Sequence, residues 1–392
     1  MTEQVGRAAD GFPADPVERV AFIAVLTLVG ALQFSIAAAN ICLTVALVAW
    51  VAVVVRGRES VEMPGFWPAL TAYAGITLIS AAFSLDRTIS LIDCKQLVLF
   101  LIVPLVYRVA RGERALTVAN VAISLGAAAA LFGIFQYGVL EYDNLGRRPQ
   151  GTLTHYMTYS GILMLVTTIA VARVLFRRVD RTWPALVLPA LLVALTLTFT
   201  RSAWVGACVG IALLLALKDR RLLAVLPVLA ALFFALAPGQ ITDRVYSVFD
   251  MQDPSNRDRF AMMRSGVAMV EARPLTGVGP DMVSRVYEEY RDPLAVKPMN
   301  PHLHNVPIQI AAERGLPALG IWLWFIVTLV ARLLATIRTT RHPFLAAAAL
   351  AAIASMLAAG LFEYNFGDSE FLMLFLVLIT LPFAADRAAR AR

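Results

Sequence analysis

The stretch Met299–Gly320 reads MNPHLHNVPIQIAAERGLPALG and contains two of the four histidines of the chain, His302 and His304. Both histidines close the one long polar segment of the sequence, residues 238–305, and a hydrophobic run follows it. Ionisable groups beside lipid are costly to place, so they are candidates for function. The sequence on either side of this stretch decides the class of fold and the place where chemistry is expected.

The composition is that of a membrane protein. Hydrophobic residues make up 59% of the 392 residues and charged residues only 16%, and the mean hydropathy is +0.72. A soluble domain has about half apolar and about a quarter charged residues. We therefore expect an all-α, polytopic fold. The N-terminal segment carries Asp10, Asp15 and Glu18 rather than the basic start of a cleaved signal peptide, so the first hydrophobic run is expected to be a retained span.

Twelve hydrophobic runs of nearly spanning length divide the chain. They cover residues 17–34, 36–55, 66–84, 89–110, 115–138, 155–176, 183–200, 202–217, 222–237, 316–335, 343–362 and 370–385. Alternate connections carry the basic groups Arg56/Arg58, Arg108/Arg111/Arg114, Arg177/Arg178/Arg181, Lys218/Arg220/Arg221, Arg338/Arg341 and Arg387/Arg390/Arg392. The positive-inside rule places these connections and both termini in the cytoplasm.

The predicted organisation follows from this topology. A cytoplasmic tail (1–16) precedes nine spans (17–237), a long segment on the opposite face (238–305), three more spans (306–385) and a second cytoplasmic tail (386–392). Within the long segment, Phe260, Met263, Val267 and Val270 recur at helical spacing and predict an amphipathic helix over residues 257–271, lying over the membrane surface. A turn at 277–280 and a short helix at 282–290 complete it.

His304 is the first candidate for chemistry. Asn305 follows it and Gly315 comes nine residues after that, so a helix that starts near Asn305 would place His304 at its entrance. An imidazole in this position could accept a proton from a hydroxyl group. The alternative is a histidine that caps the helix or bonds to a loop carbonyl group. His302 and Asn305 are possible supporting residues.

Arginines on the same face are candidates for binding an anion. Arg201 lies between two hydrophobic runs without an acidic neighbour in sequence, where its guanidinium group is suited to a phosphate. Arg257, Arg259 and Arg264 lie on the predicted helix, where Arg257 and Arg264 share a face and Arg259 points elsewhere. The alternatives are an interfacial arginine beside Trp204 and a solvated helix surface.

A further outward connection carries Arg147, Arg148 and His155. A basic pair has the wrong sign for this face under the positive-inside bias, which indicates an anionic ligand. The outward segments contain no compact Asp-x-Asp or His-x-x-x-His group, so no metal is expected, and no phosphate-binding G-x-x-x-x-G-K-[ST] loop is present. Cys42, Cys94 and Cys208 show no C-x-x-C spacing. The high pI, about 9.6, is attributed to cytoplasmic anchoring and not to nucleic-acid binding.

Together these features resemble the O-antigen ligase family over about residues 17–385. The shared features are the His-Asn-x9-Gly motif, the Arg-Ser-Ala-Trp sequence after a span, the arginine-rich helix leading to Pro-Leu-x-Gly-Val-Gly, and twelve spans. The resemblance implies a membrane-embedded glycosyltransferase of the GT-C type in the bacterial inner membrane. It would move a glycan from undecaprenyl pyrophosphate to a sugar hydroxyl of lipid A–core at the periplasmic face, during lipopolysaccharide synthesis.

By the same resemblance, His304 corresponds to the catalytic histidine, Arg201 to a phosphate-binding arginine, and Arg259 to the arginine fifteen residues before the Pro-Leu-x-Gly-Val-Gly motif. Fixed guanidinium groups could stabilise a departing pyrophosphate without a metal or cofactor, with inversion at the anomeric carbon. A polysaccharide polymerase and a protein O-oligosaccharyltransferase with the same donor remain alternatives. A transporter of lipid-linked glycans is a further one, although its charges would be expected near the membrane midplane.

Overall fold

The computed structural model describes residues 11–57, 61–177 and 179–390. Of the predicted cytoplasmic groups, residues 1–10, Arg58, Arg178 and Arg392 lie outside the described residues, and so does the side chain of Arg390. Within the described ranges every regular element is a helix, which confirms the all-α prediction.

Helices cover all twelve predicted hydrophobic runs. Those before the polar segment are α1 (Pro16–Ala31), α2 (Ile36–Gly57), α3 (Trp67–Ala82), α4 (Arg87–Asp93) continued by the 3₁₀ helix η1 (Cys94–Leu101) and α5 (Ile102–Val109), α6 (Arg114–Gly138), α7 (Tyr156–Phe176), α8 (Thr182–Leu197), α9 (Arg201–Lys218), and the 3₁₀ helix η2 (Arg220–Ala224) with α10 (Val225–Leu236). The polar segment forms α11 (Gly239–Tyr246), α12 (Pro254–Ala272) and α13 (Val283–Tyr290). The chain ends with α14 (Val306–Thr336), α15 (Pro343–Gly360), the 3₁₀ turn η3 (Asn365–Gly367) and α16 (Ser369–Arg390).

Eight of these segments are long and apolar enough to cross a membrane: α2, α4–α5, α6, α7, α9, α14, α15 and α16. The four others, α1, α3, α8 and α10, have 12 to 16 residues. A full crossing takes about 20 residues. The chain is thus a multi-pass membrane protein, and a total of twelve spans remains a prediction.

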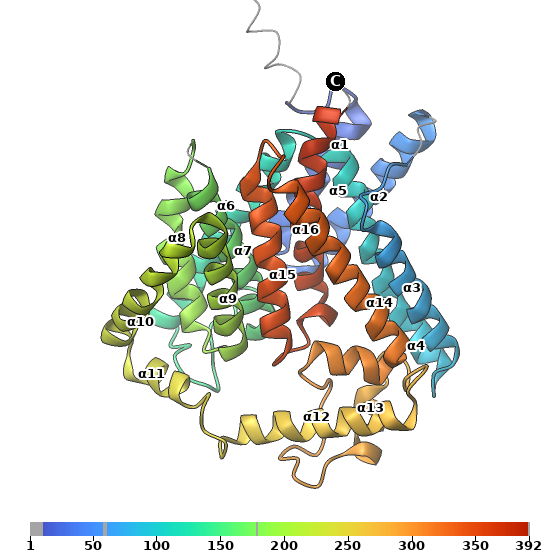
Figure 1. Cartoon of the computed structure of the whole chain (residues 1–392), viewed down its shortest axis with the longest axis vertical. Helices are drawn as coiled ribbons and strands as arrows, with labels where there is room; N and C mark the ends of the chain where they lie inside the picture. The colour runs from blue at the N-terminus through green and yellow to red at the C-terminus, as the bar shows by residue number, and fades with distance from the viewer. Residues whose placement is uncertain (1–10, 58–60, 178, 391–392) are drawn as a thin grey trace, which may run out of the picture.

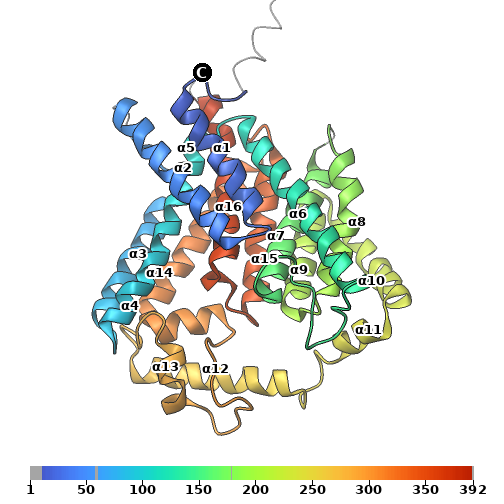
Figure 2. The ribbon, with the colours of Figure 1, turned by 180° about the vertical axis from the view of Figure 1, so that it is seen from behind.

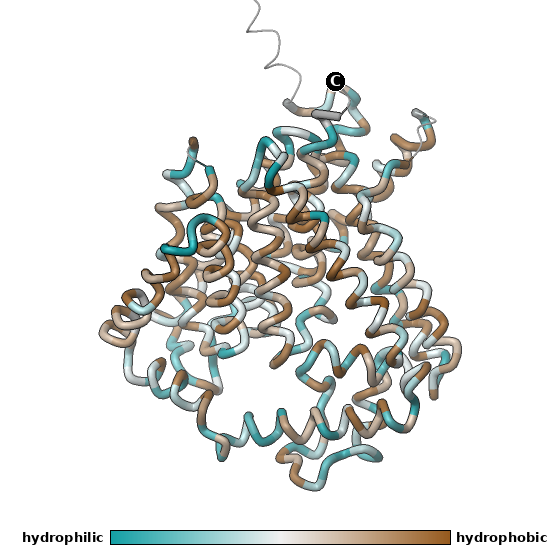
Figure 3. Tube along the Cα trace, viewed as in Figure 1, coloured by the Kyte–Doolittle hydropathy of each residue, from teal (hydrophilic) through white to brown (hydrophobic). Residues whose placement is uncertain are grey.

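The outer surface of the helix bundle is apolar, as a lipid environment requires. Val48, Val55 and Leu186 are each at least 65% exposed, and Figure 3 shows hydrophobic residues along the bundle helices. Soluble monomers rarely expose apolar patches of this extent. Inside the bundle, α15 packs against α7, α9 and α16, and small residues allow close approach: Gly206 and Gly210 of α9 lie against Ser355 of α15.

The polar segment crosses one end of the bundle. Figures 1 and 2 show α11, α12 and α13 running below the other helices, with the C-terminal end of α16 at the opposite end. The predicted bounds of the two loop helices, 257–271 and 282–290, agree with α12 and α13 to within three residues. These helices cover the end of the bundle at which α14 begins.

The protein-facing side of α12 is not its predicted apolar stripe. Phe260 and Val267 are 44% and 46% exposed, whereas the residues that turn inward are Asp258, Ala261, Met262, Ser265, Gly266 and Met269. Gly266 is needed on this face because an added Cβ would collide with Leu303. The apolar stripe thus lies on the side that faces away from the protein, as expected for an amphipathic helix that lies over the membrane surface.

The helix that follows the two histidines begins at Val306, close to Asn305 as predicted. It continues through a break at Gly315, where φ is 83°, into the hydrophobic run that was expected to start at residue 316. An added Cβ at Gly315 would overlap the carbonyl group of Leu275, so only glycine fits there. The first part of α14 is thus a short helix, residues 306–314, which a kink at Gly315 separates from the rest.

The break in α14 is where the predicted turn 277–280 attaches. The amide groups of Val278 and Gly279 donate hydrogen bonds of 2.9 Å to the carbonyl oxygens of Ala312 and Glu313, and the amide of Leu316 donates to Pro274. These bonds satisfy helix carbonyl groups that the break leaves without helical partners. The Pro-Leu-x-Gly-Val-Gly sequence therefore has a structural role: it fixes the short helix that carries His304 at its start.

Candidate active site

His304 stands directly before the first residues of α14. Its backbone has φ 49°, a left-handed conformation that is uncommon for a residue other than glycine. Nδ1 of His304 lies 2.9 Å from Oε2 of Glu363, in the connection between α15 and α16. The predicted helix entrance is confirmed, and the imidazole is held by a carboxylate 59 residues away in the sequence.

Asn305 fixes both sides of this pair. Its Oδ1 accepts a hydrogen bond from the amide of Ile308, which makes it the N-cap of α14, and its Nδ2 donates to the carbonyl oxygen of Leu361. Gln309 secures the preceding backbone, because its Oε1 accepts a 2.7 Å hydrogen bond from the amide of Leu303. The His304 backbone and the connection that carries Glu363 are thereby tied together.

Glu363 is ionised at neutral pH. Burial would raise the pKa of this carboxyl group, but the hydrogen bond and charge of His304, with the charges of His302 and Arg259, outweigh it and hold the pKa at about 2. An ionised acceptor favours the His304 tautomer with its proton on Nδ1. In that tautomer Nε2 carries a lone pair and can accept a proton.

His302 is the second imidazole at this place. Its ring centroid lies 4.1 Å from that of His304, and its Nε2 is 3.7 Å from Oε1 of Glu363. Burial, followed by repulsion from His304, lowers the pKa of His302 to about 4, so that it is neutral at neutral pH. Its Nδ1 is buried and makes no hydrogen bond within the described ranges.

His302, His304 and Glu363 could together hold a metal ion. Their ligand atoms lie within 4.8 Å of one another, and two imidazoles with a carboxylate are a set that suits zinc. The positive charge of Arg259, which interacts with Glu363, opposes a dication here. The sequence did not predict this group because its members come from two distant segments, and the absence of a metal stays a prediction.

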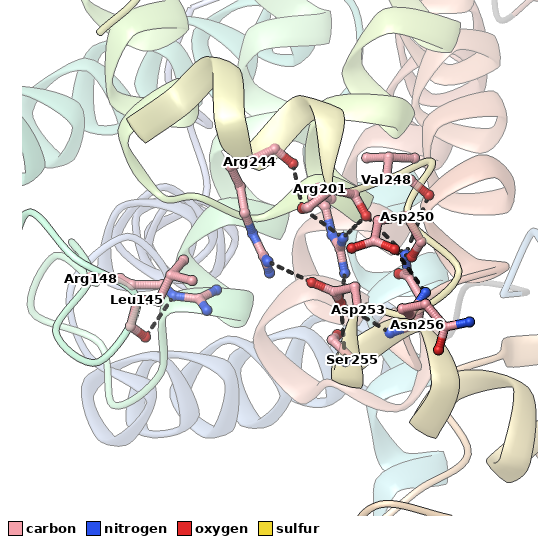
Figure 4. Close-up of polar contacts among 11 residues, drawn as sticks. Leu145, Arg148, Arg201, Arg244, Val248, Asp250, Asp253, Ser255 and Asn256 are labelled. Carbon is pink, nitrogen blue, oxygen red and sulfur yellow. Dashed lines mark hydrogen bonds and ion pairs between the residues drawn. The ribbon is translucent and has the colours of Figure 1, made fainter. Parts of the chain in front are cut away.

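Arg201 is buried at the start of α9, with its side chain 5% exposed. Its Nη1 donates to the carbonyl oxygen and the hydroxyl group of Ser247, at 2.8 Å and 2.9 Å, and its Nη2 lies 3.4 Å from Oδ1 of Asp253 (Figure 4). The backbone turns sharply before it, because Phe199 has φ 53°. Arg201 is therefore anchored by the α11–α12 connection and is not an interfacial side chain in contact with lipid.

Arg259, Arg148 and His155 gather near the same place. Burial lowers the pKa of Arg259, and the charges of Glu363 and Arg201 act on it. Burial and the charge of Arg201 lower the pKa of Arg148, whose guanidinium group lies 4.3 Å from the ring of Tyr156. Burial also lowers the pKa of His155, which interacts with Glu363 and His304 and caps α7. The structure thus brings three predicted arginines and three predicted histidines into one cluster.

The other three predicted arginines point elsewhere. Arg147 is exposed and stacks over Tyr142, and Arg257 is exposed in the first turn of α12. Arg264 donates two hydrogen bonds to Asp292, and its side chain is 51% exposed. Among the arginines of α12, Arg259 is the one whose charge acts on Glu363, the partner of His304. Their sequence spacing had left this choice open.

Sequence reasoning missed Glu363 and Arg244. Glu363 is an acidic residue in the short connection 361–368 between two spans, which is a signal of the same kind as a histidine at a span edge. Arg244 lies on α11, and its Nη1 is 4.0 Å from Oδ2 of Asp253, the N-cap of α12. Its charged neighbours come from three separate segments, around Arg148, Arg201 and Asp253, so no local pattern singles it out.

One of two comparisons with known proteins found a similarity. No curated protein matches the sequence. Residues 185–323 match the family model described as O-Antigen ligase. The matched range runs from α8 into α14 and includes Arg201, Arg244, Arg259 and His304, whereas Glu363 lies beyond it. This match, over about a third of the chain, supports membership of the O-antigen ligase family.

Proposed function

We propose that this protein is an O-antigen ligase of the bacterial inner membrane. It transfers a glycan from undecaprenyl pyrophosphate to a sugar hydroxyl group of lipid A–core. The family match supports the broader class, the O-antigen ligase and polymerase superfamily, whose members are membrane glycosyltransferase-like enzymes. In this proposal the end of the bundle with α11–α13 faces the periplasm, since the predicted basic connections belong to the cytoplasmic side.

The observation that carries the proposal is the His304–Glu363 pair beside a cluster of arginines. Glu363 orients the imidazole, and Nε2 of His304 accepts the proton of the acceptor hydroxyl group. The acceptor oxygen then forms a bond to the anomeric carbon while the bond from that carbon to the phosphate oxygen breaks. Attack opposite the leaving group inverts the anomeric configuration, and undecaprenyl pyrophosphate departs.

The arginines supply the electrostatic part of this reaction. Negative charge grows on the pyrophosphate as it leaves, and Arg201, Arg259 and Arg148 present fixed guanidinium groups to stabilise it. Arg201 is held by Ser247 before any ligand arrives, so little reorganisation is needed. The pyrophosphate donor already carries the driving energy, which makes a nucleotide site or metal unnecessary in the proposed reaction.

Two other acceptors would use the same site. A growing lipid-linked glycan would make the protein a polymerase, and a protein hydroxyl group would make it an O-oligosaccharyltransferase. The site chemistry is common to all three, so the acceptor must be identified by the product. A glycan transporter is disfavoured because the candidate groups lie together at one end of the bundle, beside α12, and not along a path between helix repeats.

The test is reconstitution of the purified protein with an undecaprenyl-pyrophosphate-linked glycan and separate acceptors, lipid A–core first. We expect glycosylated lipid A–core as the product and inversion at the new linkage. Arg201→Lys keeps the charge but loses the planar fork, so it should lower the transfer rate by about tenfold or more. A product formed only on a lipid-linked glycan would favour the polymerase. No transfer to any acceptor would contradict the enzyme proposal.

A further inference from the structure

Arg244 is a largely buried cation whose charge is poorly matched. Its side chain is 12% exposed, and within the described residues its ion pair is with Asp253, at 4.0 Å, beyond hydrogen-bond distance. Its Nε is buried and makes no hydrogen bond within the described part of the chain. A buried guanidinium group normally has its donors satisfied, so the unpartnered Nε indicates a ligand position.

The surroundings of Arg244 are positive. Burial, followed by the charges of Arg201 and Arg148, lowers the pKa of Arg244 to about 10, and Arg259 adds to the repulsion. The carboxylates that act on Arg244 and Arg259 include those of Asp253 and Glu363. Figure 4 shows Arg148, Arg201 and Arg244 directed toward the region beside Asp253. Such an excess of charge in a partly buried place is relieved by a multivalent anion.

We propose that Arg244 is a further ligand of the donor pyrophosphate, and that Asp253 competes with this anion for Arg201 and Arg244. The inference rests on the proposed function and extends it to a residue outside the predicted set. The guanidinium groups of Arg201 and Arg244 share a single carboxylate, that of Asp253. A diphosphate is a better partner for them, because each guanidinium group can bind one of its two phosphoryl groups.

The position of Asp253 is also one that suits an anion. Its Oδ1 accepts hydrogen bonds from the amide groups of Ser255 and Asn256, at 3.0 Å and 3.1 Å, at the positive end of α12. The contacts of Asp253 with Arg201 and Arg244, at 3.4 Å and 4.0 Å, are longer than good ionic hydrogen bonds. Asp253 therefore holds the two arginines loosely, and a diphosphate with more oxygens can replace it.

The variant Asp253→Asn distinguishes two roles of Asp253: competition with pyrophosphate for the arginines, and alignment of the arginines for pyrophosphate. Asparagine caps a helix as well as aspartate does, so the start of α12 is retained while one negative charge is removed. If Asp253 competes with the anion, this variant binds pyrophosphate more tightly than the native protein does. If Asp253 instead aligns the two arginines for the ligand, the same variant binds more weakly.

The experiment is titration calorimetry of inorganic pyrophosphate into the purified full-length protein in detergent. We expect Arg244→Ala to weaken binding by about tenfold or more, and Asp253→Asn to tighten it by about threefold or more. Arg285→Ala on α13 is the matched control, since it removes an exposed arginine of the same segment and should bind as the native protein does. Arg244→Lys, which keeps the charge, should lie between the native protein and Arg244→Ala and serves if the alanine variant does not fold.

Native binding by both Arg244 variants, or no binding of pyrophosphate to the native protein, would overturn the inference. Weaker binding by Asp253→Asn would overturn the competition. Binding and transfer are separate measurements, so the two proposals fail separately. Pyrophosphate binding that depends on Arg244 without any glycan transfer would refute the ligase. Transfer with no dependence on Arg244 would refute this inference alone.

Discussion

Asn305 donates a hydrogen bond from Nδ2 to the carbonyl oxygen of Leu361, 3.1 Å away, while its Oδ1 caps α14. One side chain therefore joins the helix start behind His304 to the connection that holds Glu363. The Asn of the His-Asn-x9-Gly motif aligns the pair, and the Gly permits the break that turns the short helix toward it. Positioning of this kind matters because a misplacement of about 1 Å can cost about 100-fold in rate.

Glu363→Gln should lower kcat for glycan transfer by about 100-fold or more, with a small change in the KM for the donor. The amide keeps the shape of the side chain but removes the charge that favours the Nδ1-protonated tautomer of His304. Glu363→Asp should lose less activity, because it keeps the charge on a shorter side chain. Steady-state kinetics with both variants checks this, and native kcat in Glu363→Gln would show that the carboxylate does not orient the imidazole.

Gly315→Ala should destabilise the protein and reduce transfer. The backbone at Gly315 has φ 83°, and a methyl group would overlap the carbonyl group of Leu275, so the 274–280 turn must move. Gly320→Ala is the control within the same helix, because no atom lies within 4 Å of its added Cβ. We expect Gly320→Ala to be neutral or slightly stabilising, by up to about 1 kcal/mol. Thermal unfolding in detergent measures both, and equal unfolding temperatures would contradict the role of the break.

Acid should destabilise the protein in a window set by His302. The pKa of His302 falls from 6.5 in the unfolded chain to about 4 in the fold, because burial disfavours the charged ring. Between these values the unfolded state binds the extra proton, so stability is lost as the pH falls from about 6.5 to about 4. His302→Asn cannot take up that proton and should show a shallower fall in unfolding temperature over this range. Identical pH profiles for the two proteins would refute the assignment.

Protonation of Glu363 should cause a second loss of stability, at lower pH. Its pKa is about 2 in the fold against 4.5 in the unfolded chain, so its contribution is present above about 4.5 and disappears as the pH falls toward 2. The His302→Asn variant should retain this second, more acidic loss of stability. The two phases can thus be told apart in one pH series of unfolding temperatures.

Transfer should survive an excess of chelator. His302, His304 and Glu363 could bind a metal ion, but the proposed mechanism uses Nδ1 of His304 for the hydrogen bond with Glu363 and the arginines for the charge of the leaving group. Added Zn²⁺ should then inhibit, since it would take up both His304 and Glu363. Loss of activity with chelator and its recovery with a divalent ion would instead make these three residues a metal centre.

Short sequence patterns predicted the ends of helices, which depend on neighbouring residues. The start of α14 at Asn305 follows from the preference of asparagine for a helix N-cap, and the bounds of α12 and α13 follow from apolar spacing and proline. The partners of the site were not predictable in this way. Glu363 meets His304 across 59 residues, and Asp253 meets Arg201 across 52, so both pairs depend on how the bundle packs.

Local sequence patterns also could not predict which side of α12 packs against the protein. Its inward side carries Gly266, which packs closely against Leu303, and Asp258, which accepts hydrogen bonds from the amides of Val296 and Lys297. Its apolar side chains Phe260 and Val267 stay exposed, as lipid permits. In this orientation the charge of Arg259 acts on Glu363, the partner of His304.

The most direct measurement is the transfer rate of His304→Ala in the reconstituted assay, alongside its affinity for inorganic pyrophosphate. If His304 accepts the proton of the acceptor hydroxyl group, transfer falls by about 100-fold or more while the affinity for pyrophosphate stays close to that of the native protein. Transfer at the native rate by the folded variant would contradict the central claim that His304 is the base of this reaction.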